Sequence, residues 1–141
     1  MKLNAVVKWL GEGVVFEGTT PEGAKFVMAG PKEMNNGKVL GPKPIEILLH
    51  AVAACTSVDT VAMLQSKGAQ ISEYEVIVNG ERGAEAPKPI EEINLLYNIK
   101  GKGMTPEMIK DILEIAFNVE SGVANTYKST ITWVTKLLQQ I

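Results

Sequence analysis

The chain has 141 residues, a hydrophobic share of 45% and 14 basic against 16 acidic side chains. A chain of this size buries a core without covalent cross-links, so we expect one domain over residues 1–141. The near-balanced charge, with Arg82 as the only arginine, argues against the concentrated basic face that nucleic-acid binding requires.

Cysteine and histidine each occur once, as Cys55 and His50. No disulfide therefore forms within the chain, whereas secreted domains of this size are usually richer in cysteine. There is no CxxC or HExxH motif, so we expect no metal site and no cofactor. The N-terminus lacks the apolar core of a signal peptide, and no run of 18 apolar residues occurs. We expect a cytoplasmic protein that binds neither nucleic acid nor a membrane.

The N-terminal segment alternates apolar and polar residues between turn signals, a pattern typical of short antiparallel strands. Gly-Glu-Gly and Thr-Pro-Glu-Gly sequences supply the turns. We expect three strands and then a loop, at residues 3–10, 13–19, 25–29 and 30–42.

A long helix is expected from residue 45 to residue 68, because nothing in this stretch breaks a helix. Pro44 suits a first helical turn, and Glu46 falls where the helix dipole favours a carboxylate. The first half of the helix is apolar around its circumference except for His50. Such a helix is buried rather than lying on a surface.

The C-terminal half predicts two more strands, a second helix, a helical turn and a β-rich end. Thr105-Pro106-Glu107 is a strong helix start, with a capping residue, a first-turn proline and an acid. This order of elements predicts an α+β fold. The ranges are 74–82, 93–101, 105–117, 123–127 and 130–137.

Helical geometry places Asp59 beside Cys55 and separates Cys55 from Glu46 and His50. At about 100° per residue, Asp59 lies one turn from Cys55 on the same face. A carboxylate at that distance raises the pKa of a thiol, which disfavours a nucleophile. Glu46 and His50 fall on the opposite side. An activating group must therefore come from another segment, from another subunit or from a bend near the helix start.

Each of these residues also has a purely structural interpretation. A single cysteine in an apolar helix is usually a small core residue. His50 suits a hydrogen-bonded core or interface position, Asp59 a helix surface, and Glu46 a first-turn acid. The residue pattern alone leaves both interpretations open.

Three blocks of this sequence resemble the OsmC/Ohr superfamily of osmotically induced and organic hydroperoxide resistance proteins. They are Gly-Pro-Lys-Pro-Ile-Glu-Ile-Leu-Leu at 41–49, Ala-Ala-Cys-Thr at 53–56 and Val-Asp at 58–59. The similarity continues at residues 78–82, 89–97 and 121–126. The Cys-Thr-x-x-Asp pattern is closest to the OsmC-like subgroup.

The resemblance implies an OsmC-like α+β fold, with N-terminal antiparallel strands, a long buried central helix, further strands and a second helix. It also implies an intertwined homodimer with two sites at the interface. In characterised members the central-helix cysteine is a peroxidatic nucleophile that a hydroperoxide oxidises to sulfenic acid. A second cysteine resolves it, an arginine and a glutamate activate it, and an external dithiol reduces it.

Carried over residue by residue, the resemblance assigns Cys55 as the nucleophile and Glu46 as the glutamate. The resolving position is Ser121, which cannot form a disulfide. The activating arginine of the N-terminal strands has no counterpart, unless Lys8 or Lys25 takes its place.

Three functional hypotheses follow. The first is a one-cysteine, thiol-dependent organic hydroperoxide reductase in which an external thiol reduces Cys55. The second is a catalytically degenerate dimer that binds a small apolar ligand or a partner. The third is a plain structural fold with a core cysteine.

Overall fold

The computed structural model describes residues 2–139 and has the mixed α+β class that the sequence predicts. It divides into two compact units, with the boundary between Leu48 and Leu49. Each unit contains one three-stranded sheet. The prediction of a single domain is not tested by this division and stays a prediction.

The first unit is an antiparallel meander of β1 (Val6–Trp9), β2 (Val15–Thr19) and β3 (Lys25–Ala29), as the turn signals predict. The loop after it contains a short 3-10 helix, η1 (Lys32–Met34), which the sequence pattern does not indicate. Buried Asn35 organises this loop: its side-chain oxygen accepts from the Val14 N–H at 2.9 Å.

The second unit contains the sheet β4 (Gln70–Arg82), β5 (Ile90–Lys102) and β6 (Thr130–Gln139), in that order. β4 and β5 form an antiparallel hairpin, whereas β6 pairs parallel to β5. Parallel neighbours need a long crossover. Here it comprises α2 (Pro106–Ile115), the π-helical turn η2 (Ala116–Glu120) and α3 (Gly122–Thr126). Thr105 caps α2 as predicted, accepting from the Met108 N–H at 3.1 Å.

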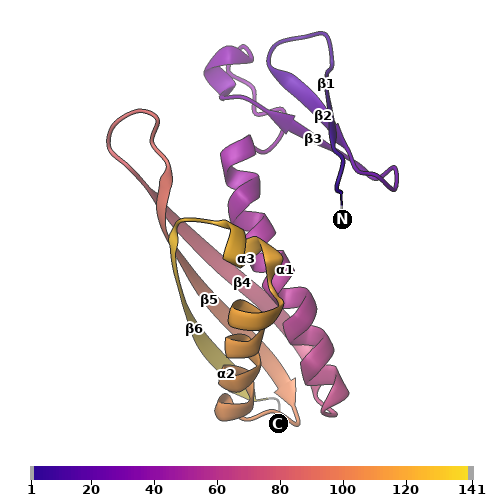
Figure 1. Cartoon of the computed structure of the whole chain (residues 1–141), viewed down its shortest axis with the longest axis vertical. Helices are drawn as coiled ribbons and strands as arrows, with labels where there is room; N and C mark the ends of the chain where they lie inside the picture. The colour runs from indigo at the N-terminus through magenta and orange to yellow at the C-terminus, as the bar shows by residue number, and fades with distance from the viewer. Residues whose placement is uncertain (1, 140–141) are drawn as a thin grey trace. The chain divides into compact units, whose positions relative to one another are not determined.

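The core of this unit lies on one face of the sheet, which α1 (Pro44–Ser66) and α2 both cover (Figure 1). Alternate residues of β5 point into it, because successive strand residues face opposite sides. They meet fully buried Val52 and Leu64 from α1 and an apolar stripe from α2. The buried members from β5 and α2 are Ile93, Leu95, Tyr97, Ile99, Ile109, Ile112 and Leu113.

The other side of α1 is apolar but exposed in the single chain. Val58 is 69% exposed and Leu48 is 42% exposed, while Ala54 is also exposed. By length and composition α1 is the one helix of the described residues that could cross a membrane. Core helices pass the same test, and the absence of a membrane span stays a prediction.

Hydroxyl groups stand between α1 and the sheet inside this otherwise apolar contact. The Thr56 hydroxyl lies 2.6 Å from the Tyr97 hydroxyl, and the Tyr74 hydroxyl donates to Ser57 at 3.0 Å. Thr60 is a further hydrogen-bond partner of Tyr74. No buried side-chain nitrogen or oxygen of the described residues lacks a partner. Since an unpaired buried hydroxyl is costly, these bonds fix where α1 sits on the sheet.

Burial raises the pKa of both Tyr97 and Tyr74, although their hydrogen bonds to helix hydroxyls act in the opposite direction. A raised folded-state pKa stabilises the fold fully below pH about 10, the ordinary tyrosine value. That stability is lost as the pH rises further, because the unfolded chain ionises first. Tyr97→Phe also removes the hydrogen bond between Tyr97 and Thr56, and this loss should lower the free energy of unfolding by about 1 kcal/mol at pH 7.

The same variant should also lose less stability than wild type between pH 9.5 and 11.5. Urea denaturation at a fixed protein concentration measures both effects. Every other ionisable group is common to the two proteins, so a difference between their curves reports Tyr97. Parallel stability-versus-pH curves for wild type and variant would contradict the assignment of this alkaline loss to Tyr97.

Candidate functional site

Cys55 lies at the border between the buried and exposed faces of α1. Its neighbours Val52, Ala53 and Thr56 are buried, Ala54 is exposed, and Cys55 itself is partly buried. The residue is not a member of the buried core cluster. The single chain therefore does not place it as the core cysteine of the structural interpretation.

Tyr127, which follows α3 directly, lies within electrostatic range of the Cys55 thiol. Its ring packs against the core cluster and is partly buried. Burial raises the pKa of the Tyr127 hydroxyl, and the charge of the Cys55 thiolate raises it further. The Tyr127 hydroxyl is therefore neutral at physiological pH and can donate a hydrogen bond. A charge on the Cys55 sulfur changes its pKa.

The segment that holds Tyr127 is built by Ser121 and Asn125. Ser121 is buried, and its hydroxyl accepts from the Ala124 N–H at 3.1 Å as the N-cap of α3. The Asn125 amide donates to the carbonyls of Phe117 at 2.8 Å and Ser121 at 2.7 Å. Ser121, the position matched to a resolving cysteine, therefore holds the turn in place.

Glu46 caps the start of α1. The Lys43 N–H donates to its carboxylate at 3.3 Å, and the Lys43 ammonium lies 3.8 Å from the same oxygen. A glutamate at the third helical position that reaches back to the N-cap N–H is half of a capping box. This geometry gives Glu46 a structural role and does not by itself test the catalytic role.

The other polar candidates have separate surroundings. His50 is exposed on α1, and Asp59 is partly buried. Lys25, one candidate for the place of the arginine, pairs with Glu17 at 3.4 Å across β2 and β3. Arg82 donates to the Lys88 carbonyl at 2.9 Å within the β4–β5 hairpin. Lys8 is exposed on β1.

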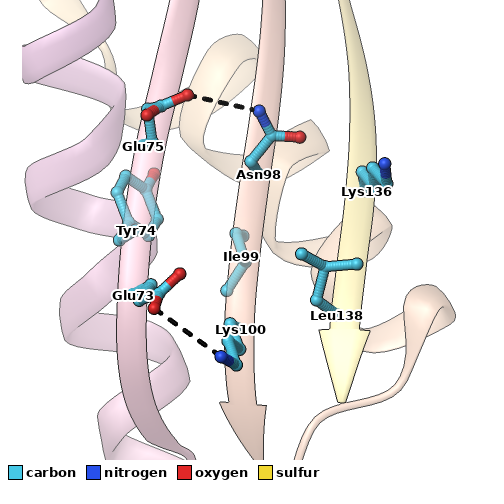
Figure 2. Close-up of a pocket in the computed structure, with 8 residues that line it drawn as sticks. All are labelled: Glu73, Tyr74, Glu75, Asn98, Ile99, Lys100, Lys136 and Leu138. Carbon is cyan, nitrogen blue, oxygen red and sulfur yellow. Dashed lines mark hydrogen bonds and ion pairs between the residues drawn. The ribbon is translucent and has the colours of Figure 1, made fainter. Parts of the chain in front are cut away.

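A depression of about 610 Å³ lies on the second sheet, and Cys55 is not among the residues that line it (Figure 2). Three of its four charged side chains have polar partners within the depression: Lys100 lies 3.6 Å from Glu73, and the Asn98 amide donates to Glu75 at 3.4 Å. Such exposed pairs contribute little energy and leave few free ligands for a bound molecule. We regard it as ordinary strand surface.

Sequence reasoning missed the three tyrosines. Tyr127 interacts electrostatically with Cys55, Tyr97 bonds to Thr56, and Tyr74 bonds to Ser57. These are the only tyrosines of the chain, and all three interact with one short stretch of α1, residues 55–60. The available signal was the run of hydroxyl residues in an apolar helix, because buried hydroxyls require partners from elsewhere.

The chain matches a family model and a known bacterial protein along most of its length. The family model described as OsmC-like protein matches residues 35–136. Protein YhfA of Escherichia coli strain K12 is 30% identical over 122 residues, which cover 86% of this chain and 87% of YhfA.

Two solved structures share the fold. An OsmC-like protein from Mycoplasma pneumoniae aligns with a TM-score of 0.78 at 20% identity, over 98% of each chain. An organic hydroperoxide resistance protein from Elizabethkingia anophelis aligns with a TM-score of 0.67 at 18% identity, over 99% of this chain and 97% of that one.

The chain belongs to the OsmC-like protein family, which confirms the resemblance inferred from the sequence blocks. The predicted OsmC-like α+β architecture is confirmed as well. The homodimer that the resemblance implies stays a prediction.

The capping geometry of Glu46 generates a test with two variants. Glu46→Ala should lower the free energy of unfolding by about 0.5–1 kcal/mol, because the Lys43 N–H loses its acceptor. Glu46→Gln keeps an acceptor oxygen and should stay within about 0.3 kcal/mol of wild type. Urea denaturation measures both. Equal losses in the two variants would show that the charge, and not the cap, matters.

Proposed function

We propose that this protein is a one-cysteine, thiol-dependent organic hydroperoxide reductase that works in the cytoplasm as a homodimer, with Cys55 as its nucleophile. One observation carries the proposal: Cys55 stands on the partly exposed flank of α1, within electrostatic range of Tyr127, and not in the core. Membership of the OsmC-like family and the fold shared with a hydroperoxide resistance protein support it.

The first step forms a sulfur–oxygen bond. The Cys55 thiolate attacks one peroxide oxygen, the O–O bond breaks, and the departing alkoxide takes a proton to leave as the alcohol. The sulfur is oxidised to sulfenic acid while the hydroperoxide is reduced. A neutral Tyr127 hydroxyl is a suitable hydrogen-bond donor to the thiolate before attack. It partly replaces the arginine that this chain lacks.

The second step needs an external thiol. Ser121 has no sulfur, and its hydroxyl already caps α3, so nothing at that position resolves the sulfenic acid. A first reductant thiol displaces water and forms a mixed disulfide with Cys55. A second reductant thiol then releases the Cys55 thiol and leaves as the oxidised disulfide.

Glu46 joins the site in this proposal through the second copy. It lies nine positions before Cys55, so an ideal helix places the two side chains on opposite sides. The exposed apolar flank of α1, with Val58 and Leu48, supports pairing of two such helices. The Glu46 carboxylate of one copy would then orient groups near Cys55 of the other.

A second candidate is a degenerate dimer that binds a small apolar ligand or a partner. The capping role of Ser121 and the capping role of Glu46 favour it, because both family positions then have structural duties. It predicts a Cys55 thiol that is protonated at neutral pH. A thiolate absorbance titration of wild type with a midpoint below about 6.5 would count against it, since a free thiol titrates near 8.5.

The turnover experiment uses cumene hydroperoxide with dithiothreitol as the reductant. Wild type should consume the hydroperoxide well above background, and Cys55→Ser should fall to background. Ala84→Ser is the matched control, because it places a serine at an exposed position of the β4–β5 loop, outside α1, and should keep wild-type turnover. Background rates in wild type as well as in Cys55→Ser would refute the enzyme proposal.

A further inference from the structure

The turn of α1 that contains Cys55 is attached to the sheet through the two residues that follow the cysteine. Thr56, the next residue, is fully buried and its hydroxyl lies 2.6 Å from the Tyr97 hydroxyl on β5. Ser57 bonds to the Tyr74 hydroxyl on β4 at 3.0 Å. Two different strands therefore hold consecutive residues directly after the cysteine.

The direction of these bonds follows from the helix carbonyls. The Thr56 hydroxyl donates its proton to the carbonyls of Val52 at 3.0 Å and Ala53 at 3.1 Å. The Ser57 hydroxyl donates to the Ala53 carbonyl at 2.5 Å. Each helix hydroxyl has one proton, so each accepts from its tyrosine. Two chains run from tyrosine through helix hydroxyl to helix carbonyl, and both reach Ala53.

These chains limit rotation of α1 about its own axis. The helix is apolar around most of its circumference, so packing alone distinguishes its rotational settings weakly. A turn of about 100°, which is one residue, would leave the Tyr97 and Tyr74 hydroxyls without their acceptors on the helix. The same turn would carry the Cys55 side chain to another direction around the helix axis. The tyrosine bonds thus select the rotational setting that fixes the direction of the sulfur.

We propose that Tyr97 and Tyr74 are positioning residues for Cys55, which set the orientation of the thiol by clamping Thr56 and Ser57. This inference deepens the proposed function, because it concerns the same sulfur. It does not need hydroperoxide turnover for its test, since thiol reactivity reports orientation and surroundings directly.

The test is the pH dependence of Cys55 alkylation by iodoacetamide, with Tyr74→Phe/Tyr97→Phe compared with wild type. Cys55 is the only thiol, so the rate reports one atom. The double variant should change the rate constant at pH 7 at least fivefold and move the midpoint of the pH profile at least half a pH unit from that of wild type. An unchanged profile would overturn the proposal.

Two control variants separate positioning from general loosening. Ile109→Val removes one methylene from a fully buried site on α2, and should stay within twofold of wild type at every pH. A shift as large as that of the double variant would overturn the proposal. Thr56→Val removes the acceptor of Tyr97, and should reproduce Tyr97→Phe and add little to it. Additive effects of these two would overturn the claim that they act through one bond.

If the double variant does not fold, the single variants Tyr97→Phe and Tyr74→Phe are tested in its place. Each should change the rate of Cys55 alkylation at least twofold, and an unchanged rate in both would overturn the proposal. Hydroperoxide turnover of wild type is measured separately. Absence of turnover refutes the reductase proposal and leaves the alkylation comparison intact, whereas an unchanged alkylation profile refutes positioning and leaves turnover intact.

Discussion

The hydroxyl groups of Thr56, Ser57 and Thr60 are the constraint on which the second unit depends. They sit in a helix that is otherwise apolar, where an unpaired hydroxyl costs more than a hydrogen bond returns. Thr56 and Ser57 accept from Tyr97 and Tyr74, whose hydroxyls come from two neighbouring strands of one antiparallel hairpin. The β4–β5 register, the rotation of α1 and the direction of the Cys55 side chain are therefore linked.

One face of α1 is buried in the single chain and the other is exposed to solvent. One face supplies Val52, Thr56 and Leu64 to the core, and the other leaves Val58 in solvent. Cys55 stands between them, where a sulfur can be reached by small molecules and still be held by buried neighbours. A second copy covering the open face would narrow that access, and would place the thiol in a partly desolvated, apolar surrounding suited to an organic hydroperoxide.

Most elements were predictable because their signals are local. Thr105 and Pro106 mark the start of α2, and the apolar stretch after Pro44 marks α1, within two residues of the observed ends. The parallel pairing of β6 with β5 was not predicted, because strand order depends on how the crossover packs on the sheet and not on the strand sequences. The family was predictable from the blocks around Glu46 and Cys55.

The site was predictable only in part. Cys55, and its position on the opposite side of α1 from Glu46, follow from spacing on one helix. The tyrosines instead come from β4, β5 and the segment after α3. Their approach to α1 is set by long-range packing that no local pattern encodes. The capping role of Glu46 is a local signal, and a first-turn acid was one of the interpretations that the sequence left open.

Sulfenic-acid trapping at Cys55 tests the central claim most directly, because it observes the first chemical step without a choice of reductant. Wild-type protein is exposed briefly to one equivalent of cumene hydroperoxide in the presence of dimedone, and the Cys55 peptide is examined by mass spectrometry. The account predicts a dimedone adduct on Cys55 that is absent without hydroperoxide. A Cys55 peptide that stays unlabelled and fully reduced would contradict it.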